Sequence, residues 1–240
     1  MDKLPEKDDV PDLRVFTVYH DDRQIWKFGL EETVVNKLFA VHRPIEGENI
    51  NHLHPIFAET VAMYWVWKND VKSKWVGFQH YHDSRFQCLD KIAGELDDDG
   101  TCFVDDYCNI PVKKQYNDSF GNNTWTFMMD ALSERFGMDN EYSRYFSQRH
   151  NFYQRCSFAM KWDKFDKLCD EMFYITDYVC GKMGFGLDLN KYFELIDKGN
   201  IEKGTPFVKL QQRSIGHLCE RFISAFIHVN FDRMLQVVCK

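Results

Sequence analysis

The fold is decided by residues 55–86, PIFAETVAMYWVWKNDVKSKWVGFQHYHDSRF. Pro55 suits the first turn of a helix, because the N–H that proline lacks is not needed there. Apolar residues then occur all round residues 56–69, which is the pattern of a helix covered on every side. After a polar turn, residues 74–79 predict a short central strand that ends in a cluster of His, Asp and Arg.

This cluster marks the expected functional site. Ligands of open α/β sheets bind just beyond the carboxyl ends of the strands. The residues that follow the predicted strand and carry polar or charged groups are His80, Tyr81, His82, Asp83 and Arg85. Glu59 belongs to the same region, since a helix over 56–69 places it in the most apolar sector, between Met63 and Val66. A carboxylate there must find a partner or a ligand.

The rest of the chain alternates predicted strands and helices in one domain, 13–240, after a charged, proline-broken lead-in over 1–12 that we expect to be flexible. His20 follows the first strand and is either a ligand contact or an ordinary loop histidine. Residues 24–46 are ambiguous between helix and strand. Strands are predicted at 13–19, 101–105 and 152–160, helices at 88–96, 124–136, 162–179 and 214–230, and loops at 47–55 and 115–123.

The predicted last helix, 214–230, is the most clearly amphipathic. Ile215, Leu218 and Phe222 share its apolar face, whereas Glu220 and Arg221 belong to the opposite, polar side. That polar side is either solvated or turned towards a cleft.

Composition excludes several classes of protein. The net charge of −7 argues against a nonspecific nucleic-acid binder, whose footprint is a basic patch. No apolar stretch reaches the roughly 18–20 residues that span a bilayer, and the start of the chain lacks a signal peptide. The eight cysteines are scattered without a Cys-x-x-Cys pair, so we expect reduced, mostly buried thiols in a cytoplasmic protein.

Three functions fit these residues. In a metal hydrolase, the pairs His52/His54 and His80/His82, with Asp83, would hold zinc or iron. In a nucleotide-sugar transferase, the strand-end cluster would neutralise a diphosphate leaving group, either through a divalent metal on acidic residues or through Arg and Lys directly. In a binding module without enzymatic activity, Glu59 would form a structural ion pair and the aromatic content of 16% would simply be core. Composition alone does not choose among them.

Several motifs resemble one known family. GENINHLHPIFAETVAMYWVWKN, VGFQHYHDSRF and GHLCERF are similar to the capsular and exopolysaccharide glycosyltransferases long filed as a domain of unknown function. The resemblance covers nearly the whole chain after the first dozen residues. The residues that fall on the family pattern are Gly47, Asn49, Ile50, Glu59, Tyr64, Trp65, Trp67, Lys68, Asn69, Gly77, His80, Tyr81, Gly216, Leu218, Glu220 and Arg221.

The resemblance implies a glycosyltransferase-A-like fold: a Rossmann-like nucleotide-diphospho-sugar transferase with a mixed central sheet flanked by helices. It implies a sugar-nucleotide donor and a glycan acceptor, lipid-linked or protein-linked, in polysaccharide or capsule biosynthesis. A lipid-linked acceptor would bring the protein to a membrane surface.

The sequence departs from the family pattern in two places. Glu48 replaces an Asp, and His82-Asp83 replace an Arg-Arg pair. We therefore expect Asp83 and His82 to hold a divalent metal, Mn or Mg, with Arg85 at the diphosphate.

The remaining expected roles combine the residue pattern with the resemblance. Glu220, on the polar side of the last helix, is the candidate general base or acceptor contact, with Asp83 as a second catalytic residue. The expected donor contacts are His20, Glu59, Lys68, His80, Tyr81, Arg85 and Arg221, with Lys68 or Arg85 as the partner of Glu59.

Overall fold

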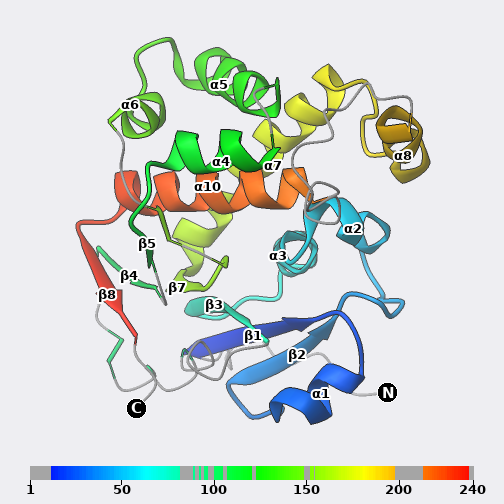
Figure 1. Ribbon diagram of the computed structural model, residues 1–240. Coiled ribbons are helices and arrows are strands. Elements are labelled where there is room, and N and C mark those ends of the chain that lie inside the picture. The colour runs from blue at the N-terminus through cyan, green and yellow to red at the C-terminus, as the bar shows by residue number, and fades with distance from the viewer. Residues whose placement is uncertain are drawn as a thin grey trace.

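Parallel strands at the start of the chain form one half of the central sheet. In this computed structural model the described residues are 12–81, 89, 92, 95–96, 100–104, 107–120, 123–148, 152–153, 155–197 and 213–237. Strand β1 (Leu13–Tyr19) pairs in parallel with β2 (Asn36–Ala40) on one side and with β3 (Trp75–His80) on the other. The carboxyl ends of all three strands therefore meet at one edge (Figure 1).

The other half of the sheet makes it mixed. Strand β7 (Phe158–Lys161) is antiparallel to both β3 and β4 (Thr101–Val104), and β8 (Arg233–Gln236) is parallel to β4. The strand order is β2-β1-β3-β7-β4-β8. A separate two-stranded sheet joins β5 (Tyr107–Cys108) to β6 (Phe152–Tyr153). The predicted α/β fold with a mixed central sheet is confirmed.

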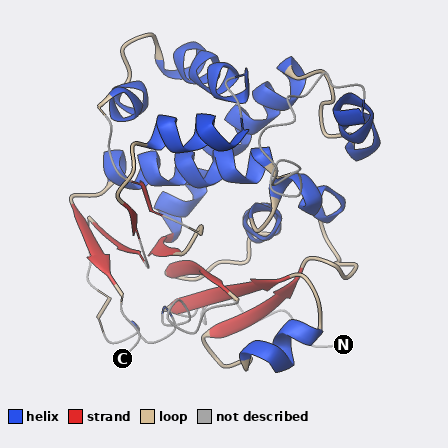
Figure 2. Cartoon of the chain, viewed as in Figure 1, coloured by secondary structure: helices blue, strands red, loops and turns tan. Residues whose placement is uncertain are grey.

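Most helices gather on one side of the sheet (Figure 2). Helix α1 (Arg23–Phe28) instead lies beside β1 and β2 (Figure 1). The helices on the main side are α2 (His54–Phe57), α3 (Thr60–Lys68), α4 (Val112–Phe120), α5 (Asn123–Phe136), α6 (Glu141–Ser147), α7 (Trp162–Lys182), α8 (Leu189–Asp197) and α10 (Ser214–Asn230), and a 3₁₀ turn η1 (Asn51–Leu53) precedes α2. No described helix is both long and apolar enough to cross a membrane.

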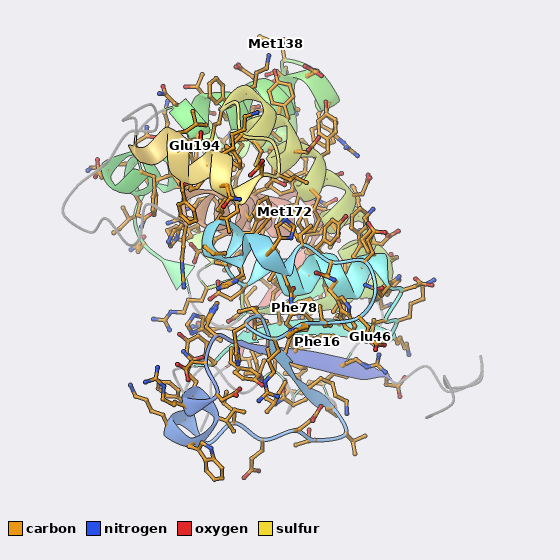
Figure 3. All side chains as sticks on the ribbon, turned by 90° about the vertical axis from the view of Figure 1, so that its right-hand side faces the viewer. Phe16, Glu46, Phe78, Met138, Met172 and Glu194 are labelled. Atoms are coloured by element: carbon orange, nitrogen blue, oxygen red, sulfur yellow. The ribbon has the colours of Figure 1, made fainter. Side chains whose placement is uncertain are left out.

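The large core fills the space between the sheet and these helices. Phe78 of β3 stacks on Phe16 of β1, with ring centroids 5.5 Å apart, and on Phe165 of α7 at 5.4 Å. Figure 3 shows Phe16 and Phe78 between the sheet and the helices above it. A smaller cluster around Trp75 and Phe103 covers the opposite face. The five cysteines whose thiols are described are free and buried, as expected.

The structure corrects three predicted elements. The single helix expected over 56–69 is broken at Ala58, whose φ of 53° and ψ of −133° are not helical. The loop expected over 115–123 is mostly helix α4, because Val112, Tyr116 and Phe120 recur every fourth residue and are buried. The strand expected over 152–160 is two strands, separated at Arg155 and Cys156, which have positive φ values.

Other predictions agree with the structure. The strand at 13–19 and the helix at 214–230 are confirmed to the residue. The ambiguous segment 24–46 contains helix α1 and strand β2. The helix expected at 88–96 lies largely outside the described residues, as does the lead-in 1–12 except for its last residue.

Candidate active site

Three polar side chains converge at the carboxyl ends of β1 and β3. His80 is the last residue of β3 and pairs with Val18 in the register of the sheet, two residues before His20. Glu59, at the start of α3, reaches both histidines: its Oε1 lies 3.2 Å from Nε2 of His20 and 3.9 Å from Nε2 of His80. The break at Ala58 makes this possible, because it places Glu59 at the end of the helix rather than in its middle.

The two histidines hold Glu59 in its charged form. Burial alone raises the pKa of this carboxyl, but the hydrogen bond from His20 and the charges of His20 and His80 outweigh burial and leave the pKa well below its usual value. A carboxylate only accepts hydrogen bonds, so Nε2 of His20 is the donor, and in the neutral form of the ring Nδ1 is the acceptor nitrogen. Nδ1 is buried and has no hydrogen-bond partner within the described part of the chain.

Aromatic rings and a hollow adjoin this centre. Tyr81 stacks on His80, with centroids 5.1 Å apart, and meets His20 edge-on at 5.5 Å. On its far side Tyr81 lines a hollow of about 580 Å³ together with Arg23 and Lys27 of α1. Lys27 is exposed and forms no ion pair with any described residue. The hollow thus joins an aromatic ring to an unpaired cation at the edge where a ligand is expected.

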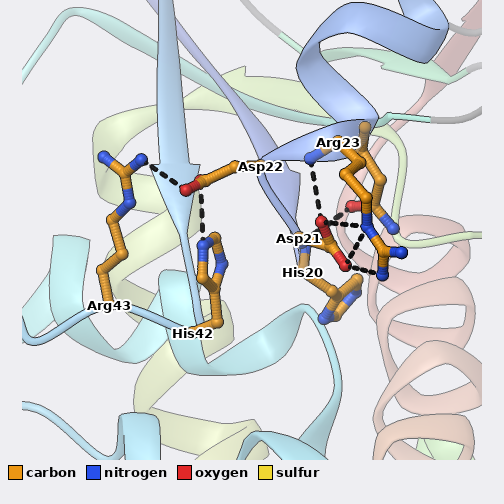
Figure 4. Close-up of polar contacts among 7 residues, drawn as sticks. His20, Asp21, Asp22, Arg23, His42 and Arg43 are labelled. Carbon is orange, nitrogen blue, oxygen red and sulfur yellow. Dashed lines mark hydrogen bonds and ion pairs between the residues drawn. The ribbon is translucent and has the colours of Figure 1, made fainter.

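The loop after β1 is fixed by two carboxylates that face different ways (Figure 4). Asp21 accepts hydrogen bonds from Arg23, which lower the pKa of Asp21 to about 2. Asp22 accepts from His42 at 2.9 Å and pairs with Arg43 at 2.8 Å. The loop that carries His20 is therefore tied both to α1 and to the segment after β2.

A second charged cluster lies on α10. Arg221 is 1% exposed and donates to Glu220, to Gln115 and to the backbone oxygen of His217. Glu220 also accepts from the backbone N–H of Arg155. Burial opposes ionisation of Glu220, but the charge of Arg221 and the hydrogen bond from His217 prevail and lower its pKa to about 2. Glu220 and Arg221 are therefore largely buried, whereas His228, later on the polar side of the helix, is exposed.

Close packing joins the two clusters. A Cβ atom on Gly216 of α10 would lie 2.9 Å from Cβ of Ala58 and 3.0 Å from the backbone of Phe57, so only glycine allows this approach. The thiol of Cys156 experiences the charges of both Glu59 and Glu220, which together with burial raise its pKa well above the usual value. The helix that carries the α10 cluster thus packs against the segment that precedes Glu59.

Several expected site residues lie elsewhere or are not described. Lys68 is at the opposite end of α3 from Glu59, where its Nζ lies 3.8 Å from the ring centre of Trp67, so the predicted Lys68–Glu59 pair is wrong. The candidates His82, Asp83 and Arg85 fall outside the described residues. Within the described part, no three His, Cys, Asp or Glu side chains lie close enough to hold a metal ion, and His52 is exposed, away from the site.

The structure also brings in residues that the sequence analysis did not select. Lys27 and Arg23 reach the hollow because α1 begins directly after the loop at the end of β1. Arg213 precedes α10, and its charge, after burial, helps to lower the pKa of His54. Arg23, Lys27 and Arg213 share one signal in the sequence: each is a cation just after the first strand or just before the last helix.

Many of the motif residues form a clamp between a loop and α3. The side chain of Asn69 accepts from the backbone N–H of Glu48 at 3.0 Å and donates to the backbone oxygens of Glu48 and Trp65, both at 2.8 Å. A Cβ on Gly47 would lie 2.0 Å from Oδ1 of Asn69, so glycine is required there. Tyr64 donates to Glu48 at 2.7 Å. These motif residues therefore hold the loop and the end of α3 together.

Comparison with known proteins agrees with this architecture. The structure is similar to the apo structure of WbbM, a bifunctional glycosyltransferase, with a TM-score of 0.61 and 16% sequence identity over 95% of this chain. The match spans 45% of the WbbM chain, so this protein corresponds to less than half of that one. No curated protein matches the sequence. The family model described as a domain of unknown function (DUF4422) matches residues 36–231, and the chain therefore belongs to this family.

Proposed function

We propose that this protein is a glycosyltransferase that moves a sugar from a nucleoside diphosphate donor to a hydroxyl group of a glycan acceptor. The observation that carries the proposal is the convergence of His20 and His80 on Glu59 at the carboxyl ends of adjacent parallel strands. That edge is where ligands of such sheets bind. The fold shared with a glycosyltransferase supports the same assignment.

The donor diphosphate needs positive charge, and two sources are available. Lys27 lines the hollow beside Tyr81 without an ion-pair partner in the described part of the chain. Asp83 and His82 are a carboxylate and an imidazole, both ligands of Mn²⁺ and Mg²⁺, and they follow Tyr81 directly in the sequence. They are therefore the proposed ligands of a divalent metal, and Arg85 follows them two residues later in the sequence.

His20 is the described group that best fits a general base. If transfer inverts the anomeric centre, the acceptor oxygen bonds to the anomeric carbon while the bond to the diphosphate breaks, and the diphosphate leaves with the electron pair. The hydroxyl proton then passes to Nδ1 of His20, once the side chains that bury this nitrogen move to admit the acceptor hydroxyl. The Glu59 carboxylate at Nε2 orients the imidazole and stabilises the imidazolium that forms.

Glu220 fits a positioning role better than the role of base. A carboxyl with a pKa of about 2 is a weak proton acceptor near neutral pH. Its hydrogen bond to the N–H of Arg155 instead holds a turn in which Arg155 and Cys156 both have positive φ values. Arg221, expected to contact the donor, holds Glu220 in place and is itself buried.

Thermal stability tests donor binding first. UDP, GDP, CDP and ADP are each added with and without manganese. A ligand at 100 times its Kd stabilises the folded state by about 2.7 kcal/mol, which corresponds to roughly 5–10 °C for a chain of this size. A shift with one diphosphate only in manganese supports Asp83 and His82 as ligands, whereas a manganese-independent shift that Lys27→Gln abolishes assigns the diphosphate to Lys27. No shift with any nucleotide would overturn the proposed function.

The role of His20 is tested by kinetics with the nucleotide sugar that this panel identifies. His20→Asn should lower kcat by about 10²–10⁴-fold, the usual contribution of a general base, and change the donor KM little. His42→Asn is the matched control, because His42 lies at the same edge but is bound to Asp22. An equal effect of both substitutions on kcat would remove His20 from the mechanism.

A further inference from the structure

We infer that the protein carries a second binding site, for an acidic sugar residue of its glycan acceptor. The inference rests on the proposed function, because it names the chemistry of the acceptor. The site is a groove of about 390 Å³ between β1, β2 and α3, which we call the edge groove because β2 is the edge strand. It is lined chiefly by Arg14, Lys37, Arg43, Phe16, Phe39 and Trp65.

The edge groove has a cation, Arg14, that is unpaired among the described residues, in a protein whose net charge is −7. It is lined by three cations and by no carboxylate. Arg43 is paired with Asp22 at 2.8 Å, and Lys37 is 3.9 Å from Glu32. Arg14 forms no ion pair or hydrogen bond with any described residue, and burial lowers the pKa of its guanidinium. A partly buried cation without a counter-charge is unfavourable, and an anion that enters the groove relieves that cost.

The rest of the lining is apolar and rigid. The ring centres of Phe39 and Trp65 are 5.5 Å apart. The indole N–H of Trp65 donates to the backbone oxygen of Glu46 at 2.7 Å, so the ring is held in place with its polar atom already satisfied. Figure 3 shows Phe16 beneath the helices, on the side where Glu46 lies. The ligand that fits such a lining has a flat apolar face and one negative charge, as a uronic acid has.

Size and position separate the edge groove from the strand-end site. Its volume falls within the range of about 300–1,000 Å³ that is usual for small-molecule sites. Arg14 is the second residue of β1, whereas His20 follows its last residue, and six residues of extended strand span about 20 Å. A donor at the strand-end site therefore leaves the groove open, and an oligosaccharide acceptor can reach both.

Calorimetric titration with methyl β-glucuronide, and with methyl β-glucoside as the uncharged match, tests the inference. We expect the glucuronide to bind the wild-type protein at least tenfold more tightly than the glucoside does. Arg14→Gln should remove most of that difference, and the control Arg23→Gln, which removes a cation from the other site, should leave it unchanged. Lys37→Gln provides a second variant of the groove that alters a more exposed side chain.

Several results would overturn the inference. Equal binding of glucuronide and glucoside, or glucuronide binding that neither Arg14→Gln nor Lys37→Gln weakens, would exclude the groove. Binding of inorganic phosphate or benzoate as tight as that of the glucuronide would exclude a site selective for sugars. If a nucleoside diphosphate still stabilises the protein while the glucuronide fails to bind, only this inference falls. If the glucuronide binds but no nucleotide does, the proposed function falls, and with it the assignment to an acceptor.

Discussion

At the scale of single residues, Glu59 shows what a sequence can and cannot predict about a buried charge. Its apolar neighbours predict that it needs a partner, and the structure confirms that need. The partner itself is His20, 39 positions earlier in the chain, and the two meet where the start of α3 lies beside the end of β1. Lys68 is closer to Glu59 in the sequence, but it lies at the far end of the same helix.

We expect Glu59→Gln to lower the free energy of unfolding by about 1.5–3 kcal/mol at pH 7, the usual worth of a hydrogen bond to a charged group. The folded pKa of Glu59 is depressed below 4.5, so the advantage of the wild type is complete above about pH 5 and shrinks as the pH falls from 4.5 towards the folded pKa. Urea denaturation from pH 7 to pH 4 measures both effects. Glu31→Gln, an exposed control, should change stability by less than about 0.5 kcal/mol. A difference between Glu59→Gln and wild type that grows on acidification would contradict the assignment.

At the scale of elements, the motif from Gly47 to Asn69 is a clamp that fixes the loop before α2 onto the end of α3. Asn69→Ala leaves the backbone N–H and oxygen of Glu48 without these partners, so we expect a loss of about 1–3 kcal/mol in the free energy of unfolding. Tyr64→Phe removes one hydrogen bond to an exposed carboxylate and should cost less than about 1 kcal/mol. Denaturation curves of the two variants measure both losses. Equal losses would mean that Asn69 is not the centre of the clamp.

Two helical glycines provide a matched test of how α10 approaches the site. Gly216→Ala places a Cβ against the backbone of Phe57, so we expect a loss of about 1–3 kcal/mol from overpacking, despite the better helix propensity of alanine. Gly181→Ala in α7 meets nothing within 4 Å and should raise stability by up to about 1 kcal/mol. Thermal unfolding of both variants measures these two changes in stability. Stabilisation by Gly216→Ala would show that α10 is not tightly packed there.

Elements differ in how far the sequence determines them. Residues 13–19 and 214–230 are predictable because a continuous β-branched run and a clear apolar helix face are local signals. Helix α4 is hard to predict because turn-forming residues at 115–123 hide an apolar repeat whose first member, Val112, precedes them. The break at Ala58 has no local signal, since alanine favours helix. It exists because α10 packs against it and because Glu59 gains His20.

At the scale of the whole molecule, the alternation of predicted strands and helices indicates an α/β sheet, but it does not predict the strand order β2-β1-β3-β7-β4-β8. The order depends on pairings between distant segments, such as Phe78 with Phe158 in β7. The candidate site likewise depends on contacts between segments that are far apart in the sequence. The parallel register of β1 and β3 places His20 close to His80, and the start of α3 adds Glu59.

The central strand β3 joins the two cores, because Phe78 packs in the large core and Trp75 in the cluster on the opposite face. We therefore expect one cooperative unfolding transition. Phe78→Leu should lower the free energy of unfolding by about 1–3 kcal/mol. Hydrogen exchange should become faster both at the Trp75 and Phe103 amides and at the α10 amides, and the loss of free energy that it reports should be the same in both places. Val34→Ala, at a position 91% exposed, is the control and should change neither. Faster exchange in α10 with unchanged exchange at Trp75 and Phe103 would show two independent cores, and β3 would then not couple the helical layer to the far face of the sheet.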